Sequence, residues 1–283
     1  MGTNEPFTID VCQRKKYESG EPIRLVWTGD WHVEMRASMY GAIRQMIEQE
    51  IGKPNTYFLH AGDWFNAVTI DHPHARKAMG GNLFEFSRKE FLEPEWVKLA
   101  IKRVKELAGF KNPNWIVGHS GNHDRRFEQD GHATIHDICD ALEAQYGGVE
   151  TIWTLKAEGK KIDIWSGHCY GGGSGEYVGT LQNRLERALG RSNVDLMLWG
   201  HFHSGTTVEA PATGRRGKEM GITRLKVGAI TPSMCNPYRS GQVNHWASRF
   251  GPYRGIGYAL IKWVPKTGFL KAEIINVADS LKD

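Results

Sequence analysis

The stretch WIVGHSGNHDRR, residues 115–126, decides how the rest of the chain is interpreted. A short apolar run, WIV, is followed by a glycine and a turn, and three polar side chains come next: Asn122, His123 and Asp124. This order is typical of a buried strand that delivers a loop to the edge of a sheet. Asparagine offers an oxygen ligand, histidine a ligand nitrogen or an acid–base group, and aspartate a carboxylate that can orient the histidine. The stretch therefore predicts a strand whose carboxyl end carries chemistry.

The same arrangement occurs twice nearer the N-terminus. Ile23–Thr28 is a predicted strand that ends at Asp30 and His32, and Thr56–Ala61 is a second one that ends at Asp63. Apolar residues at helical spacing lie between the two. Strand, loop, helix and strand in this order indicate an α/β fold, which gathers its chemistry at the carboxyl ends of strands.

The rest of the chain predicts one domain, 1–283, with two sheets packed face to face and helices outside. Residues 1–22 read as a polar lead-in, and residues 67–111 as a helical insertion or cap after the second strand. Helices are expected at 133–146 and 176–189. Further short strands are expected at 149–155, 161–166, 194–199, 206–209, 223–229, 257–264 and 271–277.

Composition restricts the class of protein. Hydrophobic residues at 40% and charged residues at 24% predict a soluble globular chain. The net charge of +4 suits a phosphate-bearing partner, and plain solubility explains it equally well. Four scattered cysteines without a C-x-x-C pair predict neither a disulfide framework nor a thiolate zinc site. No apolar run has the length of a membrane span, so we expect a cytoplasmic protein without membrane contact.

Seven oxygen and nitrogen donors stand at the predicted strand ends: Asp30, His32, Asp63, Asn122, His168, His201 and His203. A single histidine at a strand end is usually a surface or core residue, and Gly-Asp is ordinary in turns. Recurrence at five strand ends favours a metal site instead. Such ligands suit Mn, with Fe, Zn or Ni as alternatives. Seven exceed the needs of one ion and fit two ions that share a carboxylate.

These residues resemble the signature of the calcineurin-like metallophosphoesterases. In chain order the motifs are D-x-H at 30–32, G-D at 62–63, G-N-H-[DE] at 121–124, H at 168 and G-H-x-H at 200–203. The resemblance spans residues 23 to about 205. It implies a four-layer α-β-β-α sandwich with a dinuclear metal site at one end.

Carried over residue by residue, the resemblance implies two ligand sets that share a bridging Asp63. The first set is Asp30, His32 and His203, and the second is Asn122, His168 and His201. It further implies that a metal-bridging hydroxide attacks phosphorus in line with the leaving oxygen. His123 would face the phosphate, and Asp124 would fix the tautomer of His123.

Two departures from known motif patterns restrict the branch of the family that the chain resembles. The Ser/Thr protein phosphatases carry G-D-x-x-D-R-G and a Glu after the catalytic His, whereas this chain has Asp63-Trp64-Phe65-Asn66 and Asp124. The pattern looks more like the phosphodiesterase and repair-nuclease branch. That branch often has D-x-H-x-G, and here Glu34 stands where the glycine would be.

Substrate contacts are expected from a loop at 231–254, which mixes arginines with aromatic residues. Guanidinium groups bind phosphates and aromatic rings stack on bases, so Arg239, His245 and Arg249 are candidate contacts for a nucleotide or single-stranded nucleic acid. The alternative is a structural loop with solvated arginines. Asn66 and Arg126 are further candidates because they adjoin the motifs.

The sequence therefore predicts a dinuclear metal-dependent phosphodiesterase that acts on a nucleotide or nucleic-acid substrate. Two rival hydrolases stay open: a DNA exonuclease or endonuclease of the repair type, and a small-molecule phosphomonoesterase. A non-enzymatic scaffold that kept the fold is disfavoured, because such relatives lose ligands or the catalytic histidine, and this chain keeps all of them.

Overall fold

The central strands of one sheet come from the apolar runs of the first 120 residues. The computed structural model describes residues 6–14, 16–35, 37–66, 96–125, 135–169, 178–216, 219–236 and 255–277. Three strands pair in parallel at the middle of this sheet: β2 (Ile23–Thr28), β3 (Thr56–His60) and β4 (Trp115–Gly118). β5 (Gln145–Tyr146) adds in parallel beyond β4, while β11 (Ile256–Val264) and β12 (Phe269–Val277) extend the other edge in antiparallel. The order is β12-β11-β2-β3-β4-β5.

The second sheet is built mostly from the second half of the chain. Its order is β1-β6-β7-β8-β10-β9. The strands are β1 (Thr8–Asp10), β6 (Glu150–Ala157), β7 (Lys160–Gly167), β8 (Leu196–Trp199), β9 (Thr206–Arg216) and β10 (Glu219–Ile230). β7, β8 and β10 pair in parallel, so β7 and β8 end at the same edge of the sheet.

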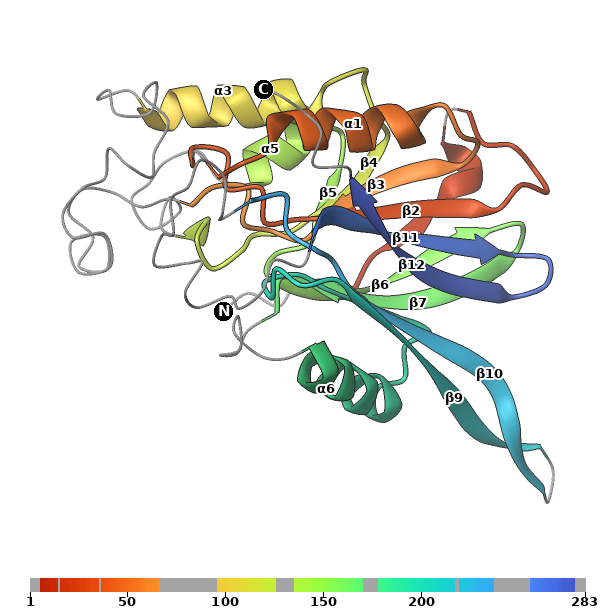
Figure 1. Ribbon diagram of the computed structural model, residues 1–283. Helices are drawn as coiled ribbons and strands as arrows, with labels where there is room; N and C mark the ends of the chain where they lie inside the picture. Colours follow the sequence, from red (N-terminus) through yellow and green to blue (C-terminus); the bar gives the residue numbers. More distant parts are fainter. Residues whose placement is uncertain are drawn as a thin grey trace.

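Helices cover both outer faces of the sheet pair (Figure 1). Three lie over the first sheet, namely α1 (Tyr40–Ile51), α3 (Trp96–Ala108) and α5 (Ile135–Ala141), and α6 (Val178–Arg191) lies over the second. The layers therefore follow the order α-β-β-α, which confirms the predicted sandwich. In the described part of the chain, no helix is long and apolar enough to cross a membrane.

Alternation along the central strands distributes side chains between two cores. Val26 and Phe58 pack under the helices, whereas Leu25, Trp27 and Tyr57 pack between the sheets. This is the period of two that a strand with two buried faces requires. The Trp27 indole donates a hydrogen bond of 3.0 Å to the carbonyl of residue 199 in β8, so the two sheets are joined by a polar contact inside the apolar layer.

Two predictions about local structure are wrong. The lead-in, residues 1–22, contains β1, which pairs in parallel with β6, and a 3-10 turn at Val11–Gln13. The helix predicted at 133–146 ends at Ala141 among the described residues. Glu143 adopts a left-handed φ of 54°, and the N–H of residue 144 donates to the Cys139 carbonyl over 2.9 Å, which closes the helix C-terminus. The chain then pairs as β5.

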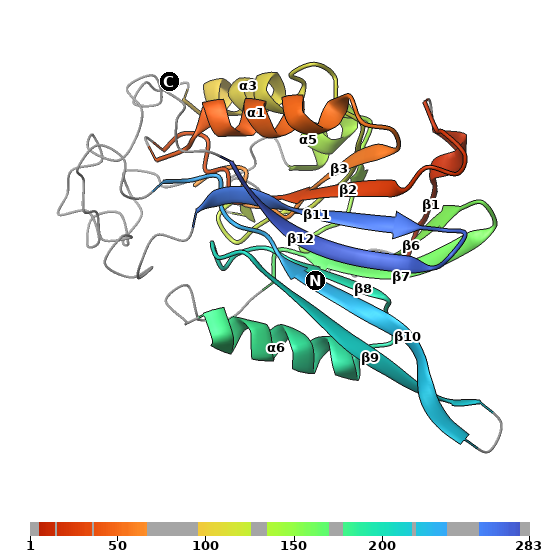
Figure 2. The same cartoon turned by 45° about the vertical axis from the view of Figure 1, so that its right-hand side comes forward.

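Two further elements differ in length or position. β9 and β10 are longer than predicted and form a hairpin that projects beyond the second sheet (Figure 2). The predicted insertion at 67–111 contributes α3, whose residues Ala100, Val104 and Leu107 are buried in the helical layer over the first sheet. The other part of this insertion, 67–95, lies outside the described residues.

Candidate metal centre

All seven predicted ligands meet at one end of the sandwich. They leave the carboxyl ends of five strands: Asp30 and His32 follow β2, Asp63 follows β3, Asn122 follows β4, His168 follows β7, and His201 and His203 follow β8. Because parallel strands end at the same edge, both sheets deliver their loops to one point.

The first set of donors contains Asp30, His32 and His203, whose ligand atoms all lie within 4.8 Å of one another. Asp30 Oδ1 is 3.4 Å from Nε2 of His203, and the rings of His32 and His203 are stacked with centroids 5.4 Å apart. Nε2 of His32 lies 3.9 Å from Asp63 Oδ2. The set is thus adjacent to the carboxylate that was predicted to bridge.

The second set is centred on Nε2 of His168. This atom lies 3.2 Å from Asp63 Oδ2, 2.8 Å from Asn122 Oδ1 and 3.2 Å from Nδ1 of His201. Nδ1 of His168 lies 3.1 Å from the Ala61 carbonyl. A carbonyl accepts only, so we assign the proton of the neutral ring to Nδ1, which directs the Nε2 lone pair at the other donors. Asp63 Oδ2 therefore lies beside both sets, 3.2 Å from His168 Nε2 and 3.9 Å from His32 Nε2.

Backbone strain is concentrated in the same residues. Five predicted ligands have positive φ angles although none is glycine: Asp30 (51°), His32 (44°), Asp63 (52°), His201 (73°) and His203 (52°). Each such residue costs on the order of 1–3 kcal/mol and persists only where its surroundings impose it. Five of the seven predicted ligands therefore share a backbone conformation that their surroundings at this end of the sandwich impose.

The segment Asp63–Asn66, which we call the hub loop, holds the neighbouring loops in place. The Asp63 carbonyl accepts the N–H groups of Trp31 (2.9 Å) and His32 (3.2 Å), and the Trp64 carbonyl accepts that of residue 33 (3.0 Å). The loop that carries the first two ligands is therefore aligned along its backbone with the hub loop.

Two buried tryptophans fasten these loops to the fold. Trp31 lies between the ligands Asp30 and His32, and its indole donates to Thr28 Oγ1 over 3.1 Å. Trp64 follows Asp63, and its indole donates to the carbonyl of residue 119 over 3.0 Å. The two rings meet edge to face with centroids 5.3 Å apart. Their burial keeps the ligand loops from shifting relative to β2 and β3.

Electrostatics at the site suit a cation. Burial opposes the ionisation of Asp63, but His168 and His123 outweigh it and hold the pKa of this carboxyl well below its usual value. Burial lowers the pKa of His32 to about 3 and that of His203 well below its usual range, so both rings are neutral donors. Burial also raises the pKa of Asp30 to about 7.

The burial and the chemistry of the donor set fit divalent metal ions. Oδ1 of Asp30 is buried and accepts no hydrogen bond from the described residues, which is costly unless a cation binds it. His168 is the exception among the rings: burial opposes its protonation, but Asp63 raises its pKa to about 9. A proton there neutralises Asp63 in the way that a bound cation would. Oxygen and imidazole donors without thiolate favour Mn, Fe, Zn or Ni.

The structure gives Asp124 a different task from the predicted one. Its carboxylate accepts the N–H groups of Gly121 (2.8 Å), Trp64 (3.3 Å) and Phe65 (3.0 Å). The prediction that Asp124 fixes the tautomer of His123 is therefore wrong. Nδ1 of His123 instead bonds the Asn66 carbonyl over 2.8 Å, and a backbone carbonyl determines the tautomer as well as a carboxylate would.

Comparison with known proteins identifies the family of the chain. The sequence profile of calcineurin-like phosphoesterases matches residues 23–205, more than half of the chain. The chain belongs to the calcineurin-like phosphoesterase family. Among solved structures it is similar to "GAP50 the anchor in the inner membrane complex of Plasmodium", with 13% identity over 91% of this chain and 90% of that chain and a TM-score of 0.28. No curated protein matches the chain significantly.

The predicted substrate contacts of this calcineurin-like phosphoesterase are described only in part. Asn66 is buried at the end of the hub loop, where its N–H and carbonyl make the bonds described here. Residues 231–236, the first part of the predicted substrate loop, lie against the first ligand loop. There Ser233 Oγ donates to the Asp30 carbonyl over 3.0 Å. Four candidates lie outside the described residues: Arg126, Arg239, His245 and Arg249.

Sequence reasoning missed three residues that hold this phosphoesterase centre together. Ser233 supports Asp30, Trp64 anchors the hub loop, and Glu34 accepts the N–H of Asn66 over 2.7 Å. Ser233 and Trp64 carry no sequence signal for such a role. Glu34 does, since it is a charged residue in a motif loop where the resemblance expects glycine.

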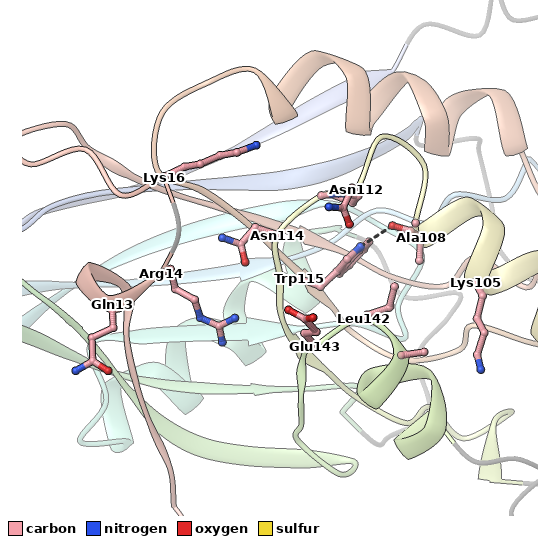
Figure 3. A pocket seen from close by; sticks show the side chains of 13 residues that line it. Gln13, Arg14, Lys16, Lys105, Ala108, Asn112, Asn114, Trp115, Leu142 and Glu143 are labelled. Atoms are coloured by element: carbon pink, nitrogen blue, oxygen red, sulfur yellow. Dashed lines mark hydrogen bonds between the residues drawn. The ribbon is translucent and has the colours of Figure 1, made fainter.

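A hollow lies at the other end of the phosphoesterase fold. It measures about 680 Å³ and is lined by residues before β4 and after α5, with Arg14, Lys16 and Lys105 at its rim (Figure 3). Trp115, the first residue of β4, lines this hollow, whereas Asn122 follows the carboxyl end of that strand. The hollow is therefore separate from the metal centre.

Proposed function

We propose that this protein is a phosphodiesterase that uses two divalent metal ions and acts on nucleotide or nucleic-acid phosphodiesters. The observation that carries the proposal is the pair of donor sets that share Asp63 Oδ2, with His123 beside them. Membership of the calcineurin-like phosphoesterases supports phosphoester hydrolysis in general. The diester preference rests on the sequence of the second motif, which lacks the Asp-Arg pair of the protein phosphatases.

The proposed ligands are divided between the two ions. Asp30, His32 and His203 would hold one ion, Asn122, His168 and His201 the other, and Asp63 both. Two divalent cations supply charge neutralisation at the phosphate and make water acidic enough to act as a nucleophile at neutral pH.

The residues of the chain position the substrate and move a proton. His123 keeps one proton on Nδ1, where the Asn66 carbonyl accepts it. Its Nε2 lies 3.9 Å from Asp63 Oδ2 and therefore faces the centre. A second proton carried on Nε2 is the one that His123 can donate to the leaving alkoxide. Asp124 supports this arrangement through the backbone, because it holds the hub loop against Gly121.

The test compares two chromogenic substrates in metal-stripped protein titrated with manganese. We expect hydrolysis of bis(p-nitrophenyl) phosphate to exceed that of p-nitrophenyl phosphate, and Asp63→Asn to abolish both. Glu50→Gln is the matched control: it changes a buried carboxylate distant from the centre and should keep activity.

Preference for the monoester would favour a phosphomonoesterase instead. Activity on DNA that falls steeply with salt would favour a nuclease. Two bound ions without turnover of any ester would contradict the proposal.

A further inference from the structure

The carboxylate of Glu34 lies beneath the hub loop and makes a contact that the proposed mechanism does not yet use. The residue is only 4% exposed although it carries a carboxyl group. Its Oε1 accepts the N–H of Asn66 over 2.7 Å. A buried carboxylate is costly unless it is well bonded, so its presence here needs a reason.

The Asn66 N–H belongs to the same planar peptide unit as the Phe65 carbonyl. The peptide is rigid, so a bond that fixes the N–H also fixes the carbonyl. Glu34 thus restrains the peptide plane between Phe65 and Asn66 at the end of the hub loop.

The next carbonyl along the chain is that of Asn66, and it bonds Nδ1 of His123 over 2.8 Å. The two preceding N–H groups of the hub loop, on Trp64 and Phe65, are already held by Asp124. Glu34 therefore completes a row of three consecutive N–H groups bonded to buried carboxylates. Asn66 is the last residue of this row, and Glu34 supplies the carboxylate that accepts its N–H.

We propose that Glu34 is a positioning residue for His123: by holding the Asn66 N–H, it keeps the Asn66 carbonyl on Nδ1 and so aims Nε2 at the leaving oxygen. This inference rests on the proposed function, since it assumes that His123 donates a proton there. It assigns a role to the residue that departs from the glycine expected in the first motif.

The test uses three substitutions that separate the effect of side-chain length from the effect of side-chain charge. Glu34→Ala removes the acceptor, Glu34→Asp keeps the charge but shortens the side chain, and Glu34→Gln keeps an acceptor oxygen at the same reach. We expect Ala and Asp to lower kcat about 10–100-fold on diesters with alkoxide leaving groups, with little change in KM, and Gln to retain most of the activity. Bis(p-nitrophenyl) phosphate should lose less than about 3-fold, because p-nitrophenolate leaves without a proton.

A second measurement does not depend on turnover. In protein labelled with ¹⁵N-histidine, the Nδ1–H signal of His123, assigned with His123→Ala, should be present in the wild type and Glu34→Gln. It should be lost in Glu34→Ala and Glu34→Asp. Glu50→Ala is the matched control, because it removes a buried carboxylate elsewhere and should leave this signal and the leaving-group dependence unchanged.

The outcomes distinguish this inference from the proposed function. An unchanged signal, or an equal loss on all leaving groups, would overturn the positioning role of Glu34. If the wild type hydrolyses no ester while the signal still depends on Glu34, the proposed function fails and the contact between Glu34 and His123 stands. Should Glu34→Ala not fold, the Asp and Gln pair alone decides the question.

Discussion

Asp63 is the residue at which the two donor sets meet, and its surroundings explain how it serves both. Oδ2 faces the imidazoles of His32 and His168, while Oδ1 accepts the N–H of His123 over 2.9 Å. One oxygen is thus directed at the centre and the other is used to hold the loop after β4. A single carboxylate therefore connects loops from both sheets.

Replacement of His123 should lower turnover without lowering the binding of metal ions. We expect His123→Ala to bind two equivalents of manganese and to lose about 10²–10⁴-fold in kcat on diesters with alkoxide leaving groups, because general acid catalysis contributes that much. Metal analysis and steady-state kinetics on one preparation measure both quantities. His136→Ala, an exposed histidine on α5, is the control and should behave as the wild type. Turnover that is unchanged in His123→Ala would refute the assigned role.

At the scale of elements, the hub loop and the loop after β4 are packed so closely that only glycine fits at Gly121. A Cβ at this position would lie 1.9 Å from Asp63 Oδ1 and 2.3 Å from the Asp63 nitrogen. Both atoms are fixed, because Asp63 is strained and buried. The glycine in the third motif is thus a packing requirement of the metal centre.

Gly121→Ala should therefore displace Asp63 and weaken metal binding. We expect a loss of about 1–3 kcal/mol in the free energy of unfolding, as overpacking typically causes, together with reduced occupancy by manganese. Denaturant unfolding and isothermal titration measure the two effects. Gly52→Ala, at a glycine with open space and an ordinary φ of −81°, is the control and should change neither. Full manganese occupancy in Gly121→Ala would contradict this packing argument.

Glu50 attaches α1 to the first sheet. Its carboxylate accepts bonds from Arg24 of β2 (2.6 Å), Tyr258 of β11 (2.7 Å) and Lys53 (2.8 Å). Burial opposes ionisation, but these donors outweigh it and hold the pKa of Glu50 below its usual value of 4.5. A lowered pKa stabilises the folded state above pH 4.5, and this stabilisation is lost as the pH falls through the folded pKa.

Glu50→Gln should accordingly destabilise the protein by about 1–3 kcal/mol at pH 7, the scale of hydrogen bonds to a charged group. The difference from the wild type should shrink as the pH is lowered below 4.5. Unfolding curves in the presence of a chelator, from pH 7 to pH 3, measure this difference without a contribution from metal ligands. A difference that grows toward low pH would show that the sign is wrong.

At the scale of the whole molecule, the metal centre is the place where the two sheets are joined by polar groups at one end of the sandwich. Asp30, Asp63 and Asn122 come from one sheet, and His168 and His201 from the other. Apolar packing also holds the sheets together, through residues such as Leu25, Leu59 and Ile164. Bound cations would therefore act as a bridge between the layers.

Removal of metal should lower the thermal midpoint of the whole chain. A ligand present at 100 times its Kd stabilises the folded state by about 2.7 kcal/mol, so chelation of the wild type should shift the midpoint by several degrees. The midpoint of Asp63→Asn should not respond to the chelator. Complete removal of metal with no shift in the wild type would show that the ions do not link the sheets.

The sequence alone predicted the layered α/β fold, which the structure confirms, and the seven candidate ligands, which the structure brings to one end of the sandwich. Both depend on short-range patterns: apolar runs form the strands, and Gly-Asp, Asn-His and His-x-His at their ends predict polar loops at one edge. The periodicity of residues 39–51 likewise predicted α1, because a helix is specified by contacts within a few residues.

Only the tertiary structure decided which residues of different motifs contact one another. That Asn66 rather than Asp124 orients His123 depends on a contact between residues 57 positions apart, and no local pattern encodes it. The helix at 135–141 is shorter than its pattern because the chain beyond it pairs with β4. Glu34 departs from the expected glycine already in the sequence, but only the fold brings its carboxylate to the N–H of Asn66, 32 positions away. Long-range hydrogen bonds depend on how strands are placed side by side, which is a property of the folded chain.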